Sequence, residues 1–108
     1  MLIRLEQETD RQQIRTINTR AFDTSAEANL VDILRRSGVP LISLVAEENG
    51  QLIGHILFSP ITLQGQTDAP AIAGLGPMAV LPDWQGQGVG GHLVTAGLKS
   101  VSYTHLTL

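Results

Sequence analysis

The hydrophobic and polar positions of this chain divide it into segments with two different periods. Four apolar or alternating runs, each bounded by turn-forming residues, have the pattern of β-strands. The expected strands are residues 2–5, 41–47, 51–61 and 72–81. Asn49 and Gly50 separate the second run from the third, and this dipeptide is a strong signal for a two-residue hairpin turn. We therefore expect the second and third strands to pair antiparallel.

Two segments between the first and second strands have helical spacing. Thr9 and Asp10 are typical N-terminal capping residues, and apolar residues follow them at intervals of three and four. The first helix is expected to bury Ile14, Ile17 and Ala21. A second helix is expected to begin near Ser25 and to end before Gly38 and Pro40. Its buried positions are expected to be Leu30, Ile33 and Leu34.

A last helix is expected over residues 88–99, with Val89, Leu93 and Ala96 on its buried stripe. Beyond it, residues 100–108 follow another pattern, in which Val101, Tyr103 and His105 alternate as in a strand. We interpret residues 1–99 as the domain and residues 100–108 as a tail foreign to it. The predicted element order, β-α-α-β-β-β-α, places the chain in the α/β class.

The segment between the fourth strand and the last helix is rich in glycine. Residues 82–91 read Pro-Asp-Trp-Gln-Gly-Gln-Gly-Val-Gly-Gly. The first turn of a helix has N–H groups without intrahelical partners, and the helix dipole adds partial positive charge there. Glycines allow a phosphate to approach the backbone closely. The segment therefore predicts a phosphate-binding loop.

Two well-known phosphate motifs fit this loop poorly. Gly86, Gly88 and Gly91 match the dinucleotide pattern G-x-G-x-x-G, but four residues separate the strand from the first glycine. No acidic residue follows Asp83, although that motif needs one for the ribose. The Walker motif is excluded because no Lys-Ser or Lys-Thr stands directly after a glycine. A dinucleotide-binding fragment remains an alternative.

A third pattern fits better. Residues 85–90, Gln-Gly-Gln-Gly-Val-Gly, match the (Arg/Gln)-x-x-Gly-x-(Gly/Ala) motif of the Gcn5-related N-acetyltransferases, the GNAT superfamily. Residues 74–82 resemble that family's central strand, and residues 52–59 resemble the strand before it. The resemblance extends from about residue 3 to residue 99. It implies a mixed, mostly antiparallel sheet in the N-terminal part of the fold, with the later strands missing because the chain is truncated.

The resemblance also implies a co-substrate, acetyl-CoA, and the residues that bind it. Its pantetheine arm would pair with the main chain of the central strand, where the backbone N–H of Ala79 would stabilise the oxyanion. The residues that the resemblance assigns to the co-substrate are Met78, Ala79, Val80, Gln85, Gly86, Gln87, Gly88, Val89, Gly90 and Gly91. Gln85 stands where many relatives have Arg, so diphosphate binding is expected to depend on the backbone. Trp84 is expected to anchor the loop by burial.

The implied reaction is direct transfer of the acetyl group to a primary amine within a ternary complex. The acceptor would be a small-molecule amine or a protein N-terminus. Because a wall of the cleft would be missing, we expect weak or no activity from this chain alone. An acyl-CoA-binding module without catalysis is the main alternative. The exposed edge of the central strand also favours pairing with a second copy, so a homodimer is considered.

The general base is not identified by the sequence, because the central strand contains no acidic residue. Candidates are Glu27 in the second helix and His55 in the third strand. Glu47 and Glu48 are further candidates, and each of the four also suits a structural or solvated role. We assign no acid role to Tyr103, which lies in the tail, and we expect His92 to lie on the surface.

Composition excludes several classes of function. The chain has 108 residues and a net charge of −3, and its longest basic cluster is Arg35-Arg36, which argues against nucleic-acid binding. It has no cysteine, so disulfides and thiolate metal sites are excluded, and no metal is expected. No apolar run reaches the length of a membrane span or has the form of a signal peptide. A cytoplasmic protein is the resulting expectation.

Overall fold

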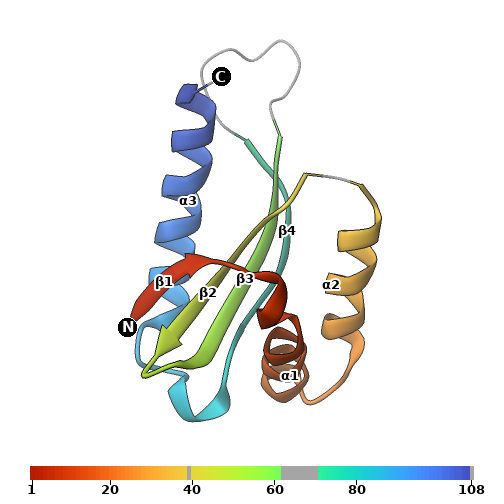
Figure 1. Cartoon of the computed structure of the whole chain (residues 1–108), viewed down its shortest axis with the longest axis vertical. Coiled ribbons are helices and arrows are strands. Elements are labelled where there is room, and N and C mark those ends of the chain that lie inside the picture. Colours follow the sequence, from red (N-terminus) through yellow and green to blue (C-terminus); the bar gives the residue numbers. More distant parts are fainter. Residues whose placement is uncertain (39, 62–70, 108) are drawn as a thin grey trace.

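The computed structural model describes the backbone of residues 1–38, 40–61 and 71–107 (Figure 1). Its strands are β1 (Leu2–Leu5), β2 (Ile42–Glu48), β3 (Gln51–Ile61) and β4 (Ala71–Val80). Its α-helices are α1 (Arg11–Phe22), α2 (Ala26–Arg36) and α3 (Val89–Thr107). Two short 3₁₀ turns, η1 (Glu8–Asp10) and η2 (Pro82–Trp84), precede α1 and α3. The predicted α/β class and element order are confirmed.

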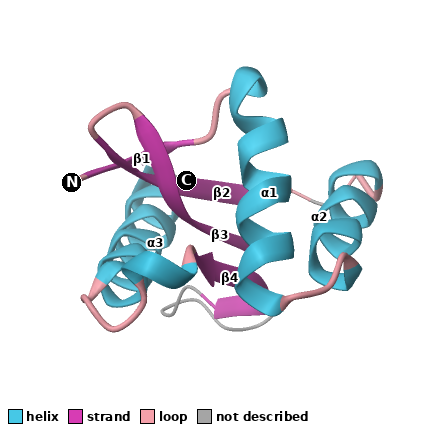
Figure 2. Cartoon of the chain, turned by 90° about the horizontal axis from the view of Figure 1, so that it is seen from below, coloured by secondary structure: helices cyan, strands magenta, loops and turns pink. Residues whose placement is uncertain are grey.

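The four strands form one antiparallel sheet in the order β1-β2-β3-β4. Figure 2 shows α3 on one face of this sheet and α1 and α2 on the other. Asn49 and Gly50 both have positive φ angles, 52° and 80°, as a two-residue type I′ hairpin requires. The predicted hairpin between β2 and β3 is therefore confirmed. Residues 62–70, between β3 and β4, are expected from their polar sequence to form a loop and lie outside the described residues.

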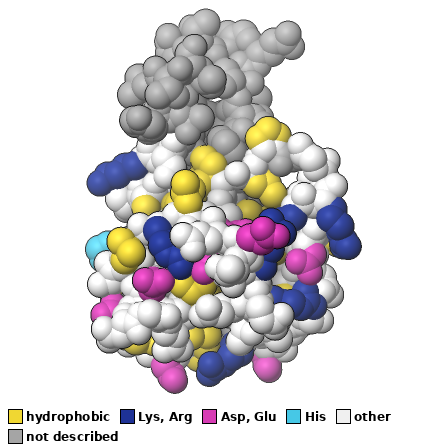
Figure 3. All heavy atoms as spheres, viewed as in Figure 1, with side chains coloured by type: hydrophobic (Ala, Val, Ile, Leu, Met, Phe, Trp, Pro, Cys, Tyr) yellow, Lys and Arg dark blue, Asp and Glu magenta, His cyan; other side chains and the backbone are white. Residues whose placement is uncertain are grey.

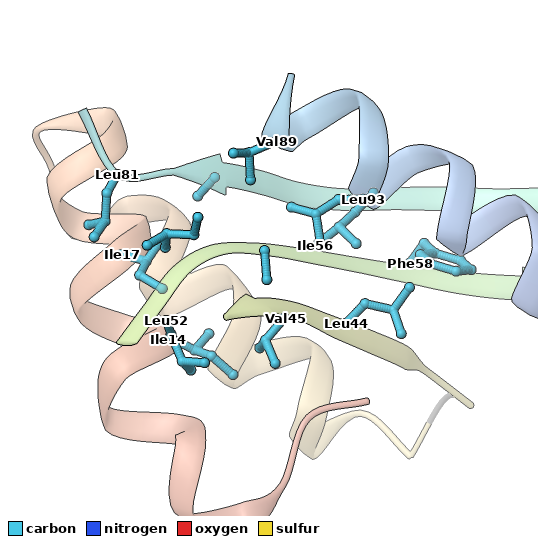
Figure 4. Packing of buried hydrophobic residues seen from close by; sticks show 13 residues of the cluster. Ile14, Ile17, Leu44, Val45, Leu52, Ile56, Phe58, Leu81, Val89 and Leu93 are labelled. Atoms are coloured by element: carbon cyan, nitrogen blue, oxygen red, sulfur yellow. The ribbon is translucent and has the colours of Figure 1, made fainter. Parts of the chain in front are cut away.

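The sheet face beneath α3 is packed with apolar side chains (Figure 4). Ile56 and Phe58 of β3 are buried there against Leu93 of α3. Two glycines permit the close approach. A Cβ atom at Gly54 would lie 3.0 Å from Leu93 Cδ1, and one at Gly97 would lie 2.9 Å from Phe58 Cε1. The glycine in the middle of α3 is thus explained by helix-to-sheet packing.

The first helix buries the predicted residues, with Ile14 and Ile17 inside and Ala21 half-buried. The prediction for α2 is wrong. Its buried residues are Ala28 and Val31, and Leu34 is half-buried. Leu30 and Ile33 are 42% and 56% exposed.

Polar contacts with α1 lie beside the buried face of α2. Arg15 of α1 donates hydrogen bonds of 2.8 Å to Asp32 and to Asn29 on α2. These contacts place the Asp32 side of α2 beside α1, and the buried residues Ala28 and Val31 lie next to that side on the helix surface. The helical spacing alone does not determine which of two apolar stripes is buried.

The prediction that the tail has strand-like alternation is also wrong. Helix α3 continues to Thr107 without interruption. Residues 100–107 contain no glycine or proline to end it, and extending a formed helix costs far less than starting one.

Candidate functional site

The loop between β4 and α3 is open on its outer side. Gly86 and Gly88 have φ angles of 78° and 88°, which residues with a Cβ rarely adopt. A Cβ added at Gly86 or Gly91 would have no neighbour within 4 Å. At Gly88 its only neighbour would be His92 Cδ2, at 3.9 Å. The loop is therefore held by backbone conformation and leaves room for a ligand beside it.

The N-terminus of α3 points its N–H groups into this open space. The first helical hydrogen bond runs from the His92 N–H to the Gly88 carbonyl, at 3.0 Å. The N–H groups of Val89, Gly90 and Gly91 precede it and have no acceptor within the helix. The helix dipole adds positive potential at the same place. Three consecutive donors in a positive potential suit a phosphate group.

The glycines of this segment have different structural reasons. Gly90 faces the sheet, where a Cβ would lie 3.2 Å from Met78 Cε, so its small size permits close packing of α3 on β4. Gly86 and Gly88 are needed for their positive φ angles. Gly91 has neither a positive φ nor a close neighbour. Of the four, it alone has no structural reason within the described residues.

The side chain of Gln85 bridges the loop to the end of β4. Its Nε2 donates a 2.9 Å hydrogen bond to the carbonyl of Val80. Gln87 donates similarly to the carbonyl of Asp83, at 3.0 Å. Both glutamines were predicted as co-substrate contacts, and in the structure both amides hold the loop together. This arrangement leaves phosphate binding to the main chain.

The register of β4 determines which of its backbone groups face outward. The N–H of Leu81 donates to the carbonyl of Ile53 at 2.9 Å, and His55 is paired with Ala79. Because hydrogen-bonded and non-bonded pairs alternate in an antiparallel ladder, the N–H and C=O of Ala79 point toward His55. Those of Met78 and Val80 point away from β3, toward the outer edge of the described sheet. Of the three predicted pantetheine contacts, these two are positioned to meet a ligand.

His55 is fully buried on the sheet face beneath α1. Its Nδ1 lies 3.3 Å from Asn18 Nδ2, and its Nε2 lies 2.9 Å from Ser43 Oγ. Because Nδ2 of Asn18 can only donate, and also donates to the Ile14 carbonyl, Nδ1 of His55 accepts and Nε2 carries the proton. Burial lowers the pKa of His55 to about 4, so the ring is neutral at pH 7. With both ring nitrogens bonded inside the protein, a structural role explains His55 fully.

The hydrogen-bond chain continues from His55 to a half-buried carboxylate, that of Glu6. Ser43 Oγ donates to Glu6 Oε1 at 2.5 Å, and Arg35 donates to Glu6 Oε2. Burial alone would raise the pKa of Glu6, but hydrogen bonds from Arg35 and Ser43 outweigh it and hold the pKa below its usual value. Sequence analysis missed Glu6, Ser43 and Asn18. Glu6 lies 37 positions from Ser43, and Asn18 lies 37 positions from His55, so no local sequence pattern connects them.

Glu27 is the carboxylate with an open acceptor. It lies half-buried in the first turn of α2, and its Oε2 is buried with no hydrogen-bond partner among the described residues. Glu47 pairs with Arg4 at 3.1 Å, and Glu48 pairs with the N-terminal amine at 3.1 Å. A buried acceptor without a donor is costly, which suits a group that receives a ligand N–H.

Trp84 is half-buried against the core, and His92 is exposed, as predicted. Within the described residues, no group of three or more His, Cys, Asp and Glu side chains is arranged to hold a metal ion. None of the described helices has both the length and the hydrophobicity needed to cross a membrane.

Comparison with known proteins identifies the family of the chain. The model of the acetyltransferase (GNAT) family matches residues 4–101. The chain is 44% identical over 93 residues to YjhQ of Escherichia coli K12, named as an uncharacterized N-acetyltransferase, and this match covers 84% of the chain and 51% of YjhQ. It is 41% identical over 103 residues to YhbS of the same strain, named likewise, with 94% of the chain and 60% of YhbS covered. The chain thus spans between half and three fifths of these relatives.

Two solved structures are similar along almost the whole chain. One is a GNAT acetyltransferase from Brucella melitensis in complex with acetyl-CoA, with a TM-score of 0.79 and 40% identity, covering 95% of this chain and 69% of that one. The other is YhbS in complex with CoA, with a TM-score of 0.78 and 38% identity, covering 95% and 57%. The predicted resemblance is therefore confirmed, and this chain belongs to the GNAT acetyltransferase family.

Proposed function

We propose that the protein transfers the acetyl group of acetyl-CoA to a primary amine. The observation that carries the proposal is the open loop at the N-terminus of α3, where the N–H groups of Val89, Gly90 and Gly91 precede the first helical hydrogen bond. A diphosphate accepts several N–H donors at once, and the loop glycines let it approach. The related structures with acetyl-CoA and CoA support this choice of ligand.

The outward groups of Met78 and Val80 would bind the pantetheine arm as a neighbouring strand would. A peptide-like amide pairs with an unpaired strand edge through main-chain hydrogen bonds. The Val80 carbonyl already accepts from Gln85, so Gln85 fixes the position at which the arm leaves the edge. An outward N–H, rather than that of Ala79, would then stabilise the oxyanion of the thioester.

Glu27 is the better of the two candidate bases. The acceptor amine must lose a proton before its lone pair attacks the thioester carbonyl, after which the CoA thiolate leaves. Oε2 of Glu27 has no partner among the described residues, whereas both nitrogens of His55 are hydrogen-bonded and its ring is fully buried. The acceptor would be a small-molecule amine or a protein N-terminus.

A non-catalytic acyl-CoA-binding module is the second candidate. The open loop and the outward groups of Met78 and Val80 would bind the co-substrate whether or not a base acts on an acceptor amine. Binding of acetyl-CoA without thiol release, across a panel of amines, would favour the module over the enzyme.

The test replaces Gly88 by valine, which puts a side chain beside the proposed diphosphate. Acetyl-CoA affinity, measured by calorimetry, is expected to fall about tenfold or more, because a lost charge-assisted contact costs about 1.5–3 kcal/mol. Gly38→Val is the matched control, since Gly38 has a φ of 78°, similar to the 88° of Gly88, and no neighbour within 4 Å. Equal affinity of the two variants would disprove the loop assignment, as would competition by NAD as strong as that by CoA.

A further inference from the structure

A cavity of about 390 Å³ lies on the sheet face opposite α3, away from the glycine loop. It is bordered by the end of β1, the first residue of α1, the last turn of α2 and the first half of β2. None of its described lining residues comes from β4, η2 or α3. The cavity is therefore separate from the proposed acetyl-CoA site.

The charged residues of the cavity carry one positive charge in excess. Arg11 and Arg35 line it together with a single carboxylate, Glu6. On the face shown in Figure 3, basic and acidic side chains are interspersed in this way and not gathered into one basic patch. Each guanidinium has about five N–H donors, while a carboxylate has about four acceptor positions, of which Glu6 gives one to Ser43. The two arginines thus have more donors than Glu6 accepts.

The two arginines are held differently. Arg35 is 17% exposed and hydrogen-bonded to Glu6, so its position is fixed. Arg11 is 58% exposed, and its Nε lies 3.6 Å from Glu6 Oε2, beyond good hydrogen-bond distance. Arg11 is therefore positioned to turn toward an anion in the cavity while the Arg35–Glu6 pair stays intact.

The remaining wall of the cavity is aliphatic. Leu5, Leu41 and Leu57 line it beside the charged groups. A ligand that fits both the arginines and the aliphatic wall has two features. It has a planar anionic head, which makes bidentate contact with a guanidinium, and it has a short hydrocarbon body, which lies against the leucines. We propose that this cavity is a second ligand site, and that it binds a small aliphatic carboxylate.

The test titrates the whole 108-residue chain with sodium butyrate and follows its amide resonances against sodium chloride of equal concentration. Saturable shifts are expected at Ser43 and Leu57, and at the ring N–H of His55, which is hydrogen-bonded to Ser43. Arg11→Gln is expected to weaken butyrate binding about tenfold, because it removes a charge-assisted contact. Arg20→Gln is the matched control on the same helix, since Arg20 is exposed and does not line this cavity.

Three results would overturn the proposal. The first is the absence of localised shifts at any soluble butyrate concentration. The second is equal binding by the Arg11→Gln and Arg20→Gln variants, or binding of inorganic phosphate or butyramide as tight as that of butyrate. The third is a parallel loss of acetyl-CoA affinity in Arg11→Gln, which would make the cavity part of the co-substrate site. Acetyl-CoA affinity is expected to be unchanged.

Discussion

The two faces of β3 are fitted to their helices by different forces. Toward α3 the strand presents Gly54, Ile56 and Phe58, which fit the helix by shape, so closely that a Cβ atom added at Gly54 or Gly97 would lie about 3 Å from a neighbouring side chain. Toward α1 it presents His55, which joins Asn18 and Ser43 through hydrogen bonds, between the buried apolar residues Ile53 and Leu57. Both sets are buried. The α3 face of β3 depends on the volumes of its side chains, and the α1 face depends also on which of its polar groups carry protons.

Because of this difference, the two faces of β3 are expected to lose stability under different perturbations. An apolar interface loses stability when atoms are removed and is indifferent to pH. A buried polar network is sensitive to any change that leaves a donor or acceptor unpaired or that protonates a buried group. The two faces can therefore be broken independently by suitable variants and conditions.

The largest effect is expected from Phe58→Ala on the α3 face. Phe58 is 1% exposed and contacts Gly97, so truncation leaves a cavity that the helix fills only in part. The free energy of unfolding, measured in urea, should fall by about 3–5 kcal/mol. Leu98→Ala on the same helix is the control, because Leu98 is 51% exposed and should cost less than about 0.5 kcal/mol. Equal losses in the two variants would refute the packing argument.

The next effect is pH dependence from the α1 face. His55 has a pKa of about 4 in the folded protein, against 6.5 without burial. Between these values the unfolded chain binds more protons, so stability is full above pH 6.5 and falls as the pH drops toward 4. From pH 7 to pH 5 we expect a loss of about 2 kcal/mol in the free energy of unfolding.

Two comparisons sharpen the pH experiment. His55→Gln should lower stability at pH 7 yet remove most of the difference between pH 7 and pH 5. Phe58→Ala should keep that difference in full, because no ionisable side chain is buried beside Phe58 among the described residues. The carboxylates of Glu6 and Asp10, whose pKa values are lowered, contribute mainly at more acidic pH. A pH dependence that survives in His55→Gln would assign it to another group.

The smallest effect is a gain in stability from Gly91→Ala. Gly91 lies in the first turn of α3 without a positive φ, and a Cβ there meets nothing within 4 Å. Alanine should therefore stabilise the protein by about 0.5–1 kcal/mol through helix propensity. Thermal unfolding measures the shift, and Gly97→Ala, whose Cβ would lie 2.9 Å from Phe58, should not show the same gain.

Sequence patterns predicted most of the secondary structure because its signals are local. The bounds of β3 and the Asn49-Gly50 turn were predicted as observed, and the glycine loop was placed correctly between β4 and α3. The burial of α2 was mispredicted, since Leu30 and Ile33 have good helical spacing. The packing partners of α2 lie elsewhere in the sequence, as Arg15 does, 17 residues from the Asp32 that it contacts, so the local pattern does not specify which stripe of α2 is buried.

The candidate site likewise contains residues that a local motif identifies and groups whose position depends on long-range pairing. Gly86 and Gly88 were identified from sequence because the glycine-rich motif is local, and their positive φ angles in the structure explain why glycine stands at both positions. The orientation of the backbone at Met78 and Val80 depends on the register with β3, which no residue of β4 specifies alone. The link from His55 through Ser43 to Glu6 joins three elements, so only the folded structure reveals it.

The alternation along β3 also limits the ways in which this protein can misassemble. If the strand slid by one residue, every side chain would change faces, and the imidazole of His55 would lie among Val89 and Leu93 without a partner. Ile56 would then meet the hydroxyl of Ser43. A polar group at this place thus enforces a unique alignment of the central hairpin, whatever its net contribution to the free energy of folding.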